Sequence, residues 1–86
     1  MHTAGLLSLA IDVARRAGYQ IREEFLDGAG GGHCLIRGQK WLLLDLTQTQ
    51  QEQLDDVLDC LRAEPRLNLQ DVPAALAAYL QVQKAA

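Results

Sequence analysis

The sequence has little of what disulfide frameworks and membrane spans require. Its 86 residues include only two cysteines, two prolines and 5% aromatic side chains. Two isolated cysteines are too few for a disulfide framework, so we expect Cys34 and Cys60 to be small core side chains, with no metal or cofactor bound. No apolar run approaches the roughly 20 residues that span a bilayer, and the N-terminus lacks the basic and apolar regions of a secretory signal. These absences favour a cytoplasmic protein without a membrane partner.

An excess of charge of one sign is also missing. The net charge is −3, and like charges form no block. Because phosphate binding needs a basic face, nucleic acid is disfavoured as the main partner. A regulatory nucleic-acid binder stays a third hypothesis, which requires five basic residues to gather on one face: Arg15, Arg16, Arg22, Arg37 and Lys40.

The length of the chain allows one domain, residues 1–86, with one core. A composition of 49% hydrophobic and 22% charged residues is typical of globular proteins. A chain this short buries only ~60–65% of the surface that its unfolded form exposes, so association with another chain is a common way to gain stability.

Helical signals mark the N-terminal segment and two segments of the second half of the chain. Residues 3–17 carry apolar side chains at helical spacing, and Gly18 suits the left-handed position that ends a helix. Thr49 and Glu52 have the spacing of a capping box, which predicts a second helix from there to about Ala63. Asp71 fits the N-cap of a third helix, whose inner stripe is expected to comprise Val72, Leu76, Tyr79 and Leu80.

The segments between the first two helices predict three strands, Tyr19–Leu26, His33–Arg37 and Lys40–Leu46. Antiparallel strands can be joined by short turns, which is what the spacing of these segments allows. We therefore expect an α+β fold in the order α-β-β-β-α-α. In this fold a three-stranded antiparallel sheet packs with about three helices.

The second and third strands are predicted to form a hairpin with two apolar faces. Gly38 and Gln39 fit a two-residue turn, which would place Ile36 opposite Trp41. One face then carries Cys34, Ile36, Trp41 and Leu43, and the other carries Leu35, Leu42, Leu44 and Leu46. A sheet in a single layer buries only one face. Two apolar faces therefore need two covers, either helices on both sides or helices on one side and a second subunit on the other.

The glycine-rich segment Gly28–Gly32 precedes a strand rather than a helix, so we interpret it as a turn and not as a phosphate-binding loop. A metal site built from His2, His33, Cys34 and Cys60 is disfavoured, because neighbouring residues of a strand point to opposite faces. For the same reason His33 is not placed to activate Cys34 as a nucleophile.

Carboxylates offer the main enzymatic alternative. Glu23, Glu24 and Asp45 lie on predicted strands, and converging strand carboxylates can hold magnesium for hydrolysis. The alternative hypothesis is therefore a hydrolase with a carboxylate site at these three residues. The competing interpretation is that Glu23 and Glu24 are solvated strand-end charges and that Asp45 meets Arg22 or caps nearby amides.

Four segments resemble a group of small, functionally uncharacterised bacterial proteins: Gly18-Tyr19-x-Ile21-Arg22-x-Glu24, Gly30-Gly31-Gly32-x-Cys34-x-x-Arg37-Gly38, Leu42-Leu43-Leu44-Asp45 and Glu52-Gln53-Leu54. This resemblance covers most of the chain and implies no activity.

The order helix, strand, hairpin, helix is also similar to the core of the IrrE/ImmA-type zinc metallopeptidases. In that family a similar step leads to a His-Glu-x-x-His helix, whereas the segment Glu52–Arg62 contains no histidine. The similarity therefore implies at most a diverged peptidase-like domain without its zinc motif, and it carries over no catalytic residue.

The leading hypothesis is a non-enzymatic protein that self-associates, most simply as a homodimer, or binds a protein partner. The candidate contact residues are Ile36, Trp41, Leu43 and Tyr79, because aromatic and apolar side chains are typical of interface centres.

Overall fold

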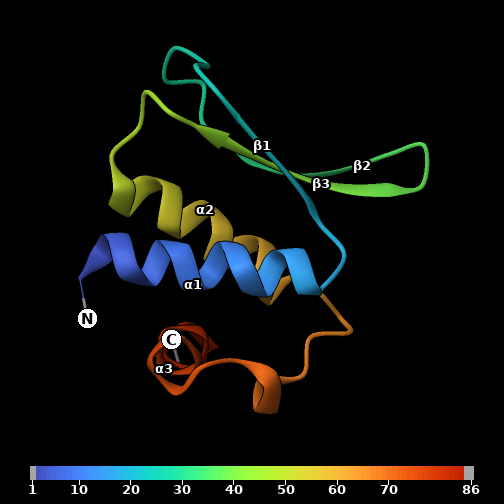
Figure 1. The fold of residues 1–86 in the computed structure, drawn as a ribbon, viewed down its shortest axis with the longest axis vertical. Helices are drawn as coiled ribbons and strands as arrows, with labels where there is room; N and C mark the ends of the chain where they lie inside the picture. Colours follow the sequence, from blue (N-terminus) through green and yellow to red (C-terminus); the bar gives the residue numbers. More distant parts are fainter. Residues whose placement is uncertain (1, 85–86) are drawn as a thin grey trace.

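The computed structural model describes residues 2–84, with side chains described as far as Leu80. The elements follow the order α1 (Thr3–Arg16), β1 (Gln20–Glu24), β2 (Gly32–Ile36), β3 (Gln39–Asp45), α2 (Gln50–Arg62), the 3-10 helix η1 (Leu69–Asp71) and α3 (Ala74–Lys84). The sheet forms one layer, α1 and α2 cover one of its faces, and α3 packs beneath these two helices (Figure 1). Among the described residues, no helix combines the length and apolar character needed to cross a membrane.

The expected α+β class is confirmed, but the expectation of a purely antiparallel sheet is wrong. The strand order is β1-β3-β2. β1 runs parallel to β3, with Ile21 beside Leu42 and Glu24 beside Asp45, while β2 is antiparallel to β3. After β1 the chain does not reverse beside it. The glycine-rich loop instead crosses the end of β3 and enters the sheet on the far side.

The side chain of Asp45, at the end of β3, explains this crossing. Its carboxylate accepts hydrogen bonds from the backbone N–H groups of Leu26 and Gly30, both at 3.0 Å, and from the N–H of Thr47 at 2.9 Å. The same carboxylate therefore binds both the loop that arrives from β1 and the loop that leaves β3. Such a contact between distant segments leaves no local pattern in the sequence.

The hairpin of β2 and β3 forms, but its predicted turn and register are wrong. The turn residues are Arg37 and Gly38, with φ angles of 52° and 79°, and Ile36 therefore pairs with Gln39. Two positive φ angles match the turn type whose twist suits a hairpin. The observed turn lies one residue earlier in the chain than the predicted turn, which shifts the pairing of the two strands by two residues. Because side chains alternate between faces with a period of two, each face carries the predicted residues.

The helix ends follow their sequence signals. Gly18 ends α1 with φ of 100°, and the predicted capping box of α2 is complete, with Glu52 N–H bonded to Thr49 Oγ1 at 3.1 Å and Thr49 N–H bonded to Glu52 Oε1 at 2.9 Å. The third helix begins at Ala74 and not directly after Asp71, because Asp71 is the last residue of η1, which is capped by Asn68.

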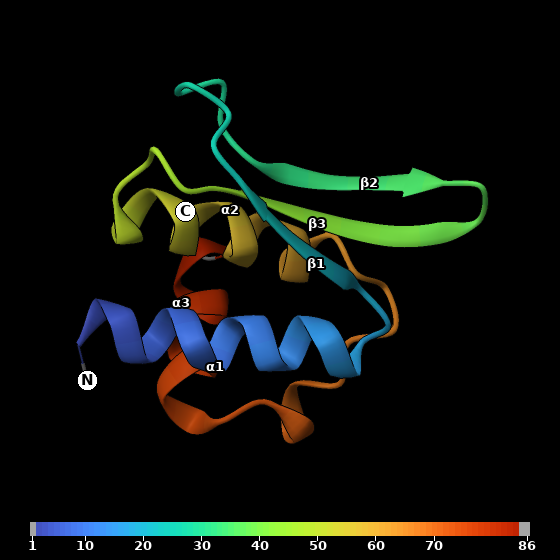
Figure 2. The ribbon, with the colours of Figure 1, turned by 45° about the horizontal axis from the view of Figure 1, so that its top comes forward.

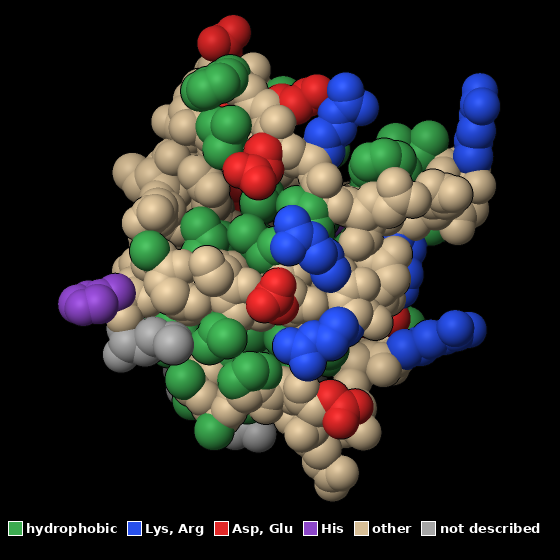
Figure 3. All heavy atoms as spheres, in the orientation of Figure 1, with side chains coloured by type: hydrophobic (Ala, Val, Ile, Leu, Met, Phe, Trp, Pro, Cys, Tyr) green, Lys and Arg blue, Asp and Glu red, His purple; other side chains and the backbone are tan. Residues whose placement is uncertain are grey.

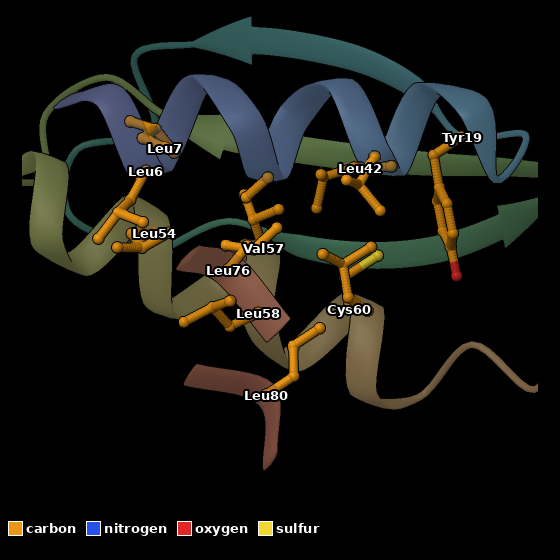
Figure 4. Packing of buried hydrophobic residues seen from close by; sticks show 14 of the residues in the cluster. Leu6, Leu7, Tyr19, Leu42, Leu54, Val57, Leu58, Cys60, Leu76 and Leu80 are labelled. Atoms are coloured by element: carbon orange, nitrogen blue, oxygen red, sulfur yellow. The ribbon is translucent and has the colours of Figure 1, made fainter. Parts of the chain in front are cut away.

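The core lies between the inner face of the sheet and the helices. Leu42 and Leu44 of β3 are buried in it, and Figure 4 shows Leu42 among the side chains of the helices. The helices contribute the remaining buried apolar side chains, among them Leu6, Leu54, Val57, Leu58, Cys60, Leu76 and Leu80. The prediction for Cys60 is confirmed, since it is fully buried. Tyr79, which was expected on the inner stripe of α3, is instead 47% exposed.

Candidate functional site

The outer face of the sheet has no helix over it in the described part of the chain (Figure 2). We use "outer face" for the apolar side chains Cys34 and Ile36 of β2 and Trp41 and Leu43 of β3. Ile36 is 50% exposed, Cys34 is exposed, and Trp41 and Leu43 are partly buried. The prediction that Cys34 is buried in the core is therefore wrong. The reason is that the helices cover the opposite face, which alternation along the strands could not decide.

Polar residues of β1 border the outer face on one side. Arg22 donates from Nε to Glu24 Oε1 at 2.7 Å, and Gln20 donates from Nε2 to Gln39 Oε1 at 2.6 Å. These contacts pair the polar side chains of β1 with one another and with Gln39. The apolar part of the face is thus limited to β2 and β3, on the side of the sheet away from β1.

The two edges of the sheet differ in chemistry. β1 carries Arg22, Glu23 and Glu24, and charges on an edge strand discourage pairing with another chain. β2, at the other edge, reads Gly-His-Cys-Leu-Ile and has neither a charged residue of the Lys, Arg, Asp and Glu types nor a proline. His33 to Ile36 are exposed, and Leu35 is 68% exposed. The β2 edge therefore lacks the usual protection.

Asp45 is a structural group and not a free carboxylate. The residue is fully buried and accepts a hydrogen bond from Thr47 Oγ1 at 2.7 Å in addition to the three backbone bonds of the crossing loops. Burial alone raises the pKa of Asp45, but the hydrogen bonds from Thr47, Leu26 and Gly30 outweigh it and hold the pKa far below its usual range. The interpretation of Asp45 as a cap for nearby amides is confirmed.

A second polar cluster lies under the start of the hairpin. Lys40 Nζ donates to the Ala17 carbonyl at 2.8 Å and to Glu64 Oε1 at 2.7 Å, and it lies 4.9 Å from the centre of the Tyr19 ring. Bonds from Lys40 and from the N–H of Arg66 hold the pKa of buried Glu64 below its usual range. Burial raises the pKa of Tyr19 above its usual range, and bonding to the Cys60 thiol raises it further.

This cluster lines one side of a hollow of about 430 Å³ beneath the tip of the hairpin, which extends past the helices. Its other walls include His33, Leu35 and Pro65. Burial raises the pKa of the Cys60 thiol, which favours its neutral and unreactive form. The cluster therefore anchors the hairpin to the segments that follow α1 and α2, and it does not present an activated nucleophile.

The structure does not bring the predicted carboxylate site together. Glu23 is exposed, Glu24 pairs with Arg22, and the oxygens of Asp45 are engaged by the loop amides. Within residues 2–84, no group of three or more His, Cys, Asp and Glu side chains is placed to hold a metal ion.

The basic residues are also dispersed. Arg15 pairs with Asp12 at 3.7 Å, and Arg22 and Lys40 pair with Glu24 and Glu64. On the face drawn in Figure 3, most Lys and Arg side chains lie on the right, and Asp and Glu side chains lie among them. The arrangement does not give the continuous basic patch that the nucleic-acid hypothesis requires.

The interaction candidates Ile36, Trp41 and Leu43 lie together on the outer face, whereas Tyr79 is on α3, beyond α1 and α2 from the sheet. Sequence reasoning missed Leu35, which it placed on the same face as Leu42 and Leu44 and did not include among the contact candidates. The signal that could have found it is the absence of charge and proline in β2. No family model, curated protein or solved structure matches this chain. The resemblances to small bacterial proteins and to the metallopeptidase core stay predictions.

Proposed function

We propose that the protein is a non-enzymatic, cytoplasmic interaction module that self-associates through its β2–β3 hairpin. The observation that carries the proposal is the hairpin itself. It exposes Cys34, Leu35 and Ile36 on the one strand of the sheet edge that has no protective charge, next to Trp41 on the uncovered face. Apolar side chains grouped in this way are typical of association surfaces.

The polar side chains support this proposal because they already form structural bonds within the domain. The Asp45 carboxylate binds loop amides, and Lys40 is bonded to Glu64. These contacts fix the hairpin on the rest of the domain. The free cysteines Cys34 and Cys60 are in keeping with a reducing compartment.

The alternative is a diverged hydrolase that uses Glu23, Glu24 and Asp45, and it has less support. Glu23 is exposed, Glu24 pairs with Arg22, and Asp45 accepts hydrogen bonds from backbone N–H groups. A site of this kind would need carboxylates that converge on a substrate. We therefore do not propose a catalytic role.

Light scattering coupled to gel filtration, from micromolar to millimolar protein, tests the proposal directly. We expect a concentration-dependent shift from monomer to dimer. Trp41 is the only tryptophan and lies on the outer face, so its emission should report any change in its exposure over the same range. A protein that stays monomeric throughout this range contradicts the proposal.

A matched pair of variants separates a specific surface from general stickiness. Ile36→Lys adds a charge to the hairpin, whereas Phe25→Lys makes the same change at a side chain that is 75% exposed outside the sheet. Since a loss of about 1.4 kcal/mol weakens binding tenfold, we expect Ile36→Lys to weaken the dimer by tenfold or more. Phe25→Lys should leave it unchanged, and an equal effect of both variants would contradict the assignment of the surface.

A further inference from the structure

We propose that two copies of this chain pair edge to edge through β2, so that their sheets become one continuous sheet, with Cys34 of one copy opposite Cys34 of the other. This proposal rests on the proposed function, because it specifies how the hairpin would bind a second copy. The two β2 strands run antiparallel around a twofold axis, which is the commonest symmetry of homodimers.

The hydrogen-bonding pattern of the hairpin identifies the free backbone groups of β2. A two-residue turn at Arg37 and Gly38 makes Ile36 and Gln39 a hydrogen-bonded pair, and such pairs alternate along an antiparallel ladder. Gly32 and Cys34 therefore also direct their N–H and C=O groups toward β3. The groups of His33 and Leu35 point outward, to the open edge of the sheet.

Only one symmetric register uses all of these outward groups. Centring the pair on Cys34 places His33 opposite Leu35 of the second copy, and both residues then bond through N–H and C=O. Centring it on His33 would require Gly31 as partner of Leu35, but the N–H of Gly31 already donates to Asp56 Oδ2 at 3.2 Å. Centring it on Leu35 would require Arg37, which lies in the turn with φ of 52°.

The same register is compatible with the side chains. Ile36 faces Gly32, the one residue of the strand without a side chain. Cys34 faces its own copy as a non-hydrogen-bonded pair, in which Cα atoms are about 4.5 Å apart. No Lys, Arg, Asp or Glu of β2 meets a like charge, because the strand contains none.

Charge complementarity favours a second copy over an unrelated strand. The register brings Arg37, at the tip of one hairpin, beside Gly31 of the other copy, which is bonded to Asp56 of α2. The acidic side chains Glu52, Asp55 and Asp59 lie near Asp56 and, together with its burial, raise the pKa of that carboxyl. A guanidinium that approaches this group relieves repulsion among the acids, at both ends of the symmetric pair.

Disulfide cross-linking of the full chain tests the register. With the azo compound diamide as oxidant, two Cys34 thiols form one S–S bond, and the two protons and two electrons that they release reduce diamide to its hydrazine. Paired strands hold the thiols at a local concentration in the millimolar range. At the lowest protein concentration at which light scattering shows the dimer, we therefore expect covalent dimer to form at least about tenfold faster than for denatured chains at the same concentration.

Two variants control the experiment. Cys34→Ser should abolish the covalent dimer, because Cys60 is fully buried. Adding Ile36→Cys to Cys34→Ser places a thiol at another exposed position of the same strand, but the proposed register holds the two copies of that thiol roughly 13 Å apart, which is about four residues along a strand. This variant should form covalent dimer no faster than denatured protein does.

The outcomes separate the two proposals. A dimer in light scattering that cross-links through Cys34 but not through the thiol at position 36 supports edge pairing. A dimer that fails to cross-link through Cys34, or that cross-links equally well from position 36, overturns edge pairing and leaves self-association standing, through the outer faces. A monomer without rapid cross-linking overturns both. As a further check, Arg37→Glu should weaken the dimer about tenfold at low salt, a loss of about 1.4 kcal/mol, whereas Arg15→Glu on α1 should not.

Discussion

Replacing Gly31 with alanine should destabilise the domain more than any other glycine replacement in the crossing loop. A Cβ atom at this position would lie 2.1 Å from the Leu43 carbonyl oxygen and 3.3 Å from the Leu44 Cα. Both are backbone atoms of β3, so no side chain can move aside to make room. Either the loop or the central strand of the sheet must shift by about 1 Å, and cores resist such overpacking.

The size of the effect follows from two contributions. Overpacking costs about 1–3 kcal/mol, and a clash with backbone on a central strand belongs at the upper end. The shift also weakens the 3.2 Å hydrogen bond from Gly31 N–H to Asp56, which contributes about 1 kcal/mol. The expected loss is therefore about 3–4 kcal/mol, a large share of the ~4–13 kcal/mol typical of an 86-residue domain.

Urea unfolding followed by Trp41 fluorescence measures this loss, and thermal unfolding should show a midpoint lowered by about 15–30 °C. Gly28→Ala is the matched control. It has φ of 79° and empty space around the added Cβ, so it should lose only the roughly 1 kcal/mol that a left-handed conformation costs an L residue. Equal losses in the two variants would refute the steric reasoning, because an added Cβ meets backbone atoms at Gly31 but nothing within 4 Å at Gly28.

Three further predictions concern the polar network, the thiols and α2. Because the pKa of Asp45 is lowered on folding, the ionised carboxylate contributes fully to stability above its unfolded pKa, and this contribution decreases as the pH falls below about 5. The difference in urea midpoint between the unchanged protein and Asp45→Asn should therefore become smaller from pH 7 to pH 3. A difference that stays constant would contradict this role of Asp45. Cys34 should react with a maleimide in the folded monomer, while Cys60 should react only on unfolding; equal rates would show that the core opens. Thr49→Ala should lower stability by about 1 kcal/mol in urea unfolding, whereas Thr49→Ser, which keeps the hydroxyl, should have little effect.

The parts of the fold that sequence predicted are those encoded within a few residues. The end of α1 depends on Gly18, and the start of α2 depends on Thr49 and Glu52, so each signal lies next to the structure that it determines. The turn was misplaced because Arg37 adopts a positive φ, which non-glycine residues seldom do. The composition of each hairpin face survived that error, because moving both strands by one residue keeps the pairing of faces.

The parts that sequence missed depend on contacts between distant residues. The parallel pairing of β1 with β3 is fixed by Asp45, which binds amides about 15 to 19 residues before it in the chain. Which face of the hairpin the helices cover depends on how α1 and α2 pack together. Alternation along a strand shows which residues share a face, but it does not show which of the two faces the helices cover. Cys34 was therefore wrongly assigned to the core.

The two polar clusters act at opposite ends of β3, and this placement bears on association. Asp45 holds the end of the strand to the crossing loop, and Lys40 holds its beginning to Glu64, just after α2. β2 is paired to β3 along its whole length. A strand fixed in this way meets a second copy already in its bound conformation, so little further ordering is required on binding. Polar groups that were candidates for chemistry thus contribute to association indirectly, by holding in place the strand β3 to which the unprotected edge is paired.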